Sequence, residues 1–179
     1  NNVAVALSTK AFTEDNLMDV ADVAIVPIAD VHRGTLRALQ YARLIASDVR
    51  AVCVATSPEV HERLERRWAR FPKLTQRIQL VIIDYDYRDI LSPLVDYVDR
   101  VNRLEFDGKL LTIVIPEFIP KEFMASMLHN QTANLLRREL RNREDIIVID
   151  VPYHIPAEIE PNRLDEPTAE PVEEAQPAA

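Results

Sequence analysis

Glycine and cysteine are scarce in this chain of 179 residues, and long apolar runs are absent. The two glycines, Gly34 and Gly108, stand apart, so neither the Walker A nor the dinucleotide glycine fingerprint is present. The single cysteine, Cys53, excludes an internal disulfide, and its apolar neighbours are typical of a buried residue in a reducing compartment. No apolar run approaches the roughly 20 residues that a membrane-spanning helix needs.

Charge is distributed unevenly along the chain. There are 21 basic and 29 acidic residues, a net charge of -8, and the stretch from Pro156 onward holds seven acids and one base. The rest of the chain is therefore near -2, which argues against nucleic acid as the main partner because phosphate binding needs clustered Lys and Arg. The terminal stretch also holds five of the twelve prolines, and we predict that residues 158–179 form a disordered acidic tail.

Five apolar runs alternate with four helical patterns between residues 22 and 157. The runs are continuous, which is typical of strands buried on both faces of a parallel sheet. We expect strands at 23–28, 49–55, 78–83, 110–115 and 146–151. This alternation of strands and helices predicts an α/β fold with a doubly wound, five-stranded parallel sheet. Right-handed crossovers and the covering of both faces then suggest the strand order 3-2-1-4-5. Residues 1–21 are expected to form a linker or a short extra element.

Prolines mark several of the predicted boundaries. Ser57 followed by Pro58 predicts a capped helix start. Pro116 and Pro152 predict the ends of the fourth and fifth strands, because proline cannot donate a ladder hydrogen bond. Between these strands we expect a crossover helix of more than twenty residues. Its middle would carry four consecutive polar residues, His129, Asn130, Gln131 and Thr132.

Two polar clusters fall near the expected ligand crevice, at the carboxyl ends of strands one and four. The loop after strand one holds Asp30, His32, Arg33 and Thr35. It could receive an anion or a ribose at a helix amino terminus, or Asp30 could cap that helix. The cluster from His129 to Thr132 could reach the crevice, or it could fix the packing of the crossover through hydrogen bonds. Both pairs of alternatives remain open.

Other candidate groups carry weaker signals. Tyr85 and Arg88, with Tyr87, could stack on a base or could be ordinary exposed loop residues. The nearby aspartates lack the glycine and the terminal glutamate of a calcium loop, and the four histidines lack zinc-site spacing, so no metal is expected. No nucleophile–base pair is apparent, and we predict no enzymatic activity.

Several motifs together resemble one known family. They are His32-Arg33-Gly34-Thr35-Leu36, Tyr87-Arg88 with Pro93-Leu94, Pro116-Glu117-Phe118, Leu128-His129-Asn130-Gln131-Thr132-Ala133 and Val151-Pro152-Tyr153-His154. With them, residues 23–155 resemble the carboxy-terminal cytosolic domain of amino-acid–polyamine–organocation permeases, a group that includes potassium importers of the KimA type. The layout is also similar to universal stress proteins, which are α/β folds that bind adenine nucleotides.

The resemblance implies a regulatory and dimerising domain of a bacterial transporter of potassium or an amino acid. It implies a position at the cytoplasmic side of the membrane, attached to the transporter's own transmembrane part, and a homodimer. It also implies a link to the nucleotide second messenger cyclic di-AMP, with no cofactor. The alternative is a freestanding universal-stress-type nucleotide-binding protein.

The first testable prediction concerns ATP. Without a glycine-rich loop to bring backbone amides close to the phosphates, ATP should bind weakly or not at all. Calorimetric titration of ATP into the purified chain is expected to show no saturable binding at micromolar concentrations. A micromolar dissociation constant would contradict the prediction.

Overall fold

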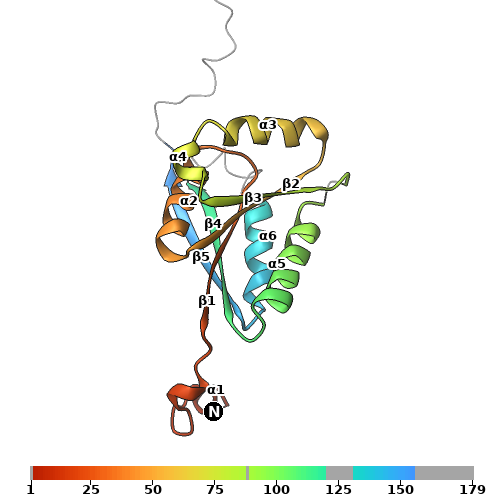
Figure 1. The fold of residues 1–179 in the computed structure, drawn as a ribbon. Helices are drawn as coiled ribbons and strands as arrows, with labels where there is room; N and C mark the ends of the chain where they lie inside the picture. The colour runs from red at the N-terminus through yellow and green to blue at the C-terminus, as the bar shows by residue number, and fades with distance from the viewer. Residues whose placement is uncertain (1, 88, 120–130, 156–179) are drawn as a thin grey trace, which may run out of the picture.

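Five parallel strands form one sheet in the computed structural model, which describes residues 2–87, 89–119 and 131–155 (Figure 1). The strands are β1 (Val20–Pro27), β2 (Asp48–Ala55), β3 (Ile78–Asp84), β4 (Leu110–Ile119) and β5 (Ile146–His154). Their order is β3-β2-β1-β4-β5, and every neighbouring pair is parallel. The predicted fold class and strand order are confirmed.

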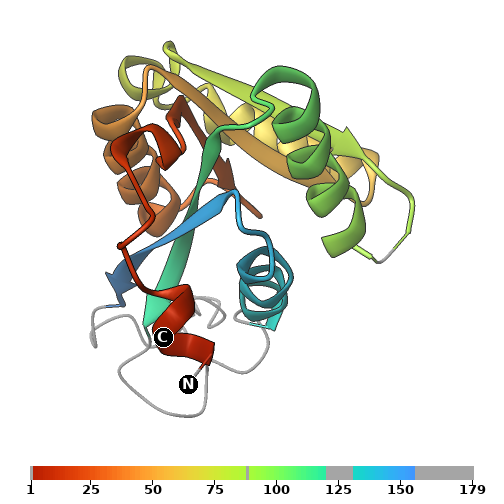
Figure 2. The same cartoon turned by 90° about the horizontal axis from the view of Figure 1, so that it is seen from below.

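Helices cover both faces of the sheet (Figures 1 and 2). The main helices α2 (Arg33–Ile45) and α3 (Pro58–Trp68) pack on one face, and α5 (Leu91–Glu105) and α6 (Gln131–Arg141) pack on the other. The predicted cap of α3 is confirmed, since the Ser57 side chain accepts a hydrogen bond from the Val60 backbone. A short helix that the sequence analysis did not predict, α4 (Pro72–Thr75), precedes β3.

The core consists of two apolar layers separated by the sheet. In β1, Ala24 and Val26 belong to the layer under α2, and Val23 and Ile25 belong to the layer under α5 and α6. All four are at most 1% exposed. Burial of alternate residues on opposite faces explains why the strands are continuously apolar in sequence.

The predictions that strands four and five end at Pro116 and Pro152 are wrong. The β4–β5 pairing continues through both prolines to the pair Ile119 and His154. On its other side, β4 is paired with β1 only as far as Ile113, so Pro116 lies where no ladder to β1 has to be maintained. Pro152 lies on an edge strand, where the missing N–H is tolerated. The two strands therefore extend beyond β1 as a ribbon.

The structure describes the segment before the predicted domain but not the tail after it. The amino-terminal residues form α1 (Asn2–Ala6) and a 3-10 helix, η1 (Glu14–Asn16), which lie apart from the sheet (Figure 1). β1 begins at Val20, three residues earlier than predicted. The predicted tail lies outside the described residues, as do His129 and Asn130. The described part of the crossover helix begins at Gln131, so Thr132 lies at its start.

A matched pair of leucines on α2 tests the packing of this face. Leu39 is fully buried and Leu44 is 82% exposed. We expect Leu39→Ala to lower the free energy of unfolding by about 2–5 kcal/mol, because it leaves a cavity in the core. The control Leu44→Ala should change it by less than about 0.5 kcal/mol. Urea denaturation measures both, and equal losses would contradict the assigned orientation of α2.

Candidate functional site

A cavity of about 360 Å³ lies at the carboxyl ends of β1 and β4, the place that the strand order predicts. We call it the switch-point cavity. Its walls come from β1, β2 and β4 and from the amino-terminal turns of the surrounding helices. The apolar wall residues include Pro27, Ile28, Val54, Leu94, Ile115 and Leu136.

The switch-point cavity has few polar side chains, which are three threonine hydroxyls and one imidazole. They belong to His32, Thr35, Thr56 and Thr132, and no Asp, Glu, Lys or Arg is among the described residues that line it. Such a wall can hold a flat, mostly apolar group and form a few hydrogen bonds to its edges. Apart from the imidazole of His32, its described lining residues offer no titratable group to a phosphate or a carboxylate.

His32 and Thr35 are held together by the start of α2. His32 is the N-cap, and its Nδ1 accepts a hydrogen bond from the backbone N–H of Thr35 at 3.1 Å. The Thr35 hydroxyl donates to the carbonyl oxygen of Asp30 at 2.7 Å, and the Thr35 side chain is fully buried. The interpretation in which Asp30 caps this helix is wrong, because the imidazole of His32 occupies that role.

Asp30 instead connects the β1–α2 loop to α3. Its carboxylate forms ion pairs with Arg67 and, at 3.6 Å, with Arg63, and it accepts a hydrogen bond from the Val31 backbone. Arg33, the first residue of α2, is exposed and forms no ion pair with the described residues. The first predicted cluster is therefore divided. His32 and Thr35 line the cavity, whereas Asp30 and Arg33 lie outside its wall.

The other predicted binding residues are only partly brought together. Thr132 lines the cavity and is exposed, whereas the positions of His129, Asn130 and Arg88 lie outside the described residues. Gln131 belongs to α6, and its side chain is not described. Tyr85 packs against the core under α5, with its ring 5.2 Å from that of Tyr87, and it does not line the cavity.

Asp84, the last residue of β3, and Asp89, in the loop after it, have structural partners. Asp84 lies 2.7 Å from the Nδ1 atom of His61 and raises the pKa of that imidazole. Asp89 accepts hydrogen bonds from the backbone N–H groups of Leu91 and Ser92 at the start of α5. Among residues 2–87, 89–119 and 131–155, no group of three or more potential ligands could hold a metal ion.

Cys53 precedes the cavity residue Val54 in β2 and has a poorly reactive thiol. Its side chain is buried, and its thiol donates to the carbonyl oxygen of Ala29 at 3.8 Å. Burial, with a smaller contribution from the Asp30 carboxylate, raises the pKa of Cys53 to about 11. The thiolate is the reactive form, so this residue is not a nucleophile near neutral pH.

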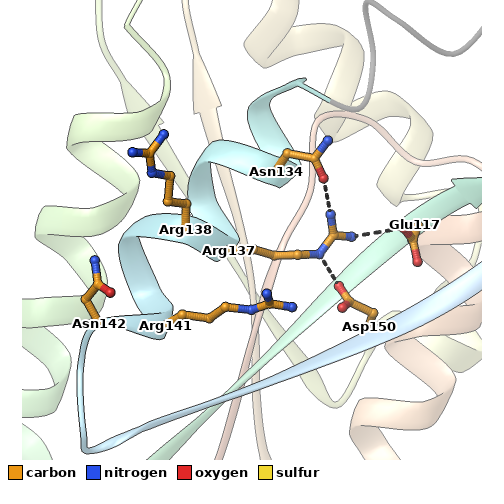
Figure 3. A pocket seen from close by; sticks show the side chains of 7 residues that line it. All are labelled: Glu117, Asn134, Arg137, Arg138, Arg141, Asn142 and Asp150. Carbon is orange, nitrogen blue, oxygen red and sulfur yellow. Dashed lines mark hydrogen bonds and ion pairs between the residues drawn. The ribbon is translucent and has the colours of Figure 1, made fainter.

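A second hollow, of about 440 Å³, lies along α6 beside β4 and β5 (Figure 3). We call it the arginine hollow. It is lined only by polar side chains, those of Glu117, Asn134, Arg137, Arg138, Arg141, Asn142 and Asp150. This hollow was not predicted from the sequence. The available signal was the spacing of Arg137 and Arg141, which places both on one side of a helix.

The family of the chain follows from its sequence over most of its length. Residues 19–153 match the model of the KimA potassium transporter C-terminal domain. The chain belongs to this family. It is 32% identical to the potassium transporter KimA of Bacillus subtilis (strain 168) over 133 residues, which are 74% of this chain and 21% of that protein. The chain therefore spans about a fifth of the length of that relative.

A solved structure supports the fold of the KimA C-terminal domain. The chain superimposes on a universal stress protein from Archaeoglobus fulgidus with a TM-score of 0.51 and 15% identity, covering 73% of this chain and 93% of that one. The predicted resemblance to KimA-type transporter domains is confirmed, and the predicted likeness to universal stress proteins is confirmed for the fold. The KimA family is that of a transporter domain. In the described part of the chain, no helix is both long and apolar enough to cross a bilayer.

Two threonines line the switch-point cavity, and they differ in burial: Thr35 is buried and Thr132 is exposed. Thr35→Val removes a buried hydroxyl and leaves the Asp30 carbonyl oxygen without this donor, so we expect a loss of about 1–3 kcal/mol in the free energy of unfolding. The control Thr132→Val changes an exposed side chain and should shift it by less than about 0.5 kcal/mol. Thermal or urea unfolding measures the difference. Equal effects would contradict the capping geometry of α2.

Proposed function

We propose that this KimA C-terminal domain is the cytosolic regulatory and dimerisation domain of a bacterial potassium transporter. We further propose that its switch-point cavity receives a base of a nucleotide second messenger such as cyclic di-AMP. The observation that carries the ligand proposal is a mostly apolar cavity, with no Asp, Glu, Lys or Arg among its described lining residues, at the topological switch point of a transporter-family domain. Potassium as the solute, the cytoplasmic position and the transmembrane partner rest on the family alone.

The size and chemistry of the cavity suit a nucleobase. Its volume of about 360 Å³ lies within the range of roughly 300–1,000 Å³ for small-molecule sites. Apolar side chains from β1, α5 and α6 offer surfaces for the faces of a flat ring. The hydroxyls of Thr56 and Thr132 offer hydrogen bonds to its edges.

The phosphates of such a ligand would have to lie outside the cavity. Arg33 is the nearest candidate in sequence, since it directly follows the cavity residue His32 and is exposed. It also stands at the amino end of α2, where the helix dipole favours an anion. A carboxylate role for Asp30 fits less well, because Arg67 and Arg63 already engage it.

A two-fold symmetric ligand suits a homodimer. Each half of cyclic di-AMP could meet the same residues on each chain of a two-fold dimer. The outer side of α2 presents apolar side chains for pairing, with Tyr41 38%, Leu44 82% and Ile45 40% exposed. A stable pair needs a total buried surface of roughly 1,000 Å² or more. The freestanding nucleotide-binding alternative has no comparable support, since the chain matches a transporter domain.

The test is calorimetric titration of cyclic di-AMP into the purified domain at physiological salt. We expect saturable binding that Arg33→Ala weakens roughly ten- to hundredfold, because a charge-assisted hydrogen bond contributes about 1.5–3 kcal/mol. The control Arg70→Ala removes another exposed charge and should leave the affinity unchanged. Sedimentation should show a larger dimer fraction when the ligand is present.

Each outcome bears on a separate part of the proposal. An absence of saturable binding would refute the ligand and leave the pairing role to be judged by sedimentation. Tight binding that is indifferent to Arg33 would place the phosphates elsewhere, with Tyr85 and Arg88 as the next residues to change. A chain that stays monomeric at high concentration, with and without ligand, would contradict dimerisation by this domain.

A further inference from the structure

The arginine hollow is built around one buried guanidinium. The side chain of Arg137 is 9% exposed. Its Nε donates to Asp150 at 2.5 Å, its Nη1 donates to Asn134 at 2.6 Å, and its Nη2 lies 3.5 Å from Glu117. Nη2 forms no hydrogen bond within the described part of the chain. Both carboxylates of the hollow are thus committed to one arginine, whose orientation is fixed.

Positive charge remains in the hollow after this pairing. Arg138 and Arg141 are exposed, and neither forms an ion pair with the described residues. Three guanidinium groups against two carboxylates leave an excess of one positive charge. Arg141 follows Arg137 by one helical turn, a spacing at which like charges destabilise a helix. A bound anion would offset that repulsion.

The directions of the three arginine side chains show which of them is available to a bound anion. Arg137 and Arg141 extend from α6 in the same direction, toward Asp150, whereas Arg138 points away from them (Figure 3). Asn134 lies on the preceding turn, near the guanidinium of Arg137 (Figure 3). Arg141 is therefore the available cation, and the fixed Arg137 adds positive charge beside it.

We propose that the arginine hollow binds a phosphate group, with Arg141 as the main contact. The planar guanidinium fork matches phosphate oxygens in a bidentate manner. A nucleobase would find no apolar wall here, because all seven lining residues are polar. The hollow is separate from the switch-point cavity, since Ala133 and Leu136 face that cavity from the same helix. The proposal therefore stands without the nucleotide hypothesis.

Two sources could supply the phosphate. One is a free phosphorylated metabolite, and the other is an anionic lipid headgroup, because the family is that of a membrane transporter. In the first arm of the test, pyrophosphate is titrated into the full chain by calorimetry. In the second arm, the chain is sedimented with vesicles of phosphatidylcholine, with and without phosphatidylglycerol. Anionic-vesicle binding that pyrophosphate displaces would identify the headgroup, and pyrophosphate binding without vesicle binding would identify the free compound.

The expected result is saturable binding that Arg141→Gln weakens about tenfold, the lower end for loss of a charge-assisted bond. Arg103→Gln is the matched control, because it removes the same charge from an exposed position on α5 and should leave the affinity unchanged. Arg33→Ala should also retain pyrophosphate binding, which separates this site from the proposed nucleotide site. Because Arg141 is exposed and its charge repels that of Arg137, the melting temperature of its variant should not fall.

Two results would overturn the proposal. One is the absence of saturable binding in both arms. The other is an equal loss in Arg141→Gln and Arg103→Gln, which would show that only the overall charge matters. If Arg141→Gln does not fold, Arg141→Lys replaces it, and retention of full affinity with a lysine would contradict bidentate recognition.

Discussion

The central strands β1 and β4 are covered on both faces, by α2 on one face and by α5 and α6 on the other. Their connections leave in opposite directions, β1 toward α2 and β4 toward α6, because the strand order reverses between them. No single helix can then close the carboxyl ends of both strands. The switch-point cavity is the space left by this constraint, and its apolar walls are continuations of the two core layers.

Helix α6 joins this cavity to the arginine hollow. Ala133 and Leu136 face the first, and Arg137 and Arg141 face the second. Burying a guanidinium costs free energy, and the loss is offset only when carboxylates and hydrogen bonds are well placed. Asp150 and Glu117 provide this pairing from β5 and from the extended part of β4. Asp150, before Pro152 in β5, and Glu117, just past Pro116 in β4, therefore hold in place the helix that forms a wall of the cavity.

The sequence correctly predicted the features that depend on runs of neighbouring residues. Continuous apolar runs identified all five strands, and the crossover rules then left one strand order. The strand ends were wrong because tolerance of Pro116 and Pro152 depends on which neighbours accompany each strand. The interpretation of Asp30 as a cap failed for a similar reason. Arg63 and Arg67, its ionic partners, come from α3, and nothing in the loop's own sequence identifies them.

The lack of Lys and Arg in the described wall of the switch-point cavity bears on how the proposed ligand would bind. No Lys or Arg is among the described residues that line the switch-point cavity, so the phosphates of a nucleotide would need permanent cations from outside its walls. Arg33, a second copy of the chain or the rest of the transporter could provide them. A site completed by another chain binds its ligand more tightly when the chains are paired, and the ligand then stabilises the pair to the same extent. The proposed regulatory role depends on such reciprocity, because ligand binding and pairing of the chains would then stabilise each other.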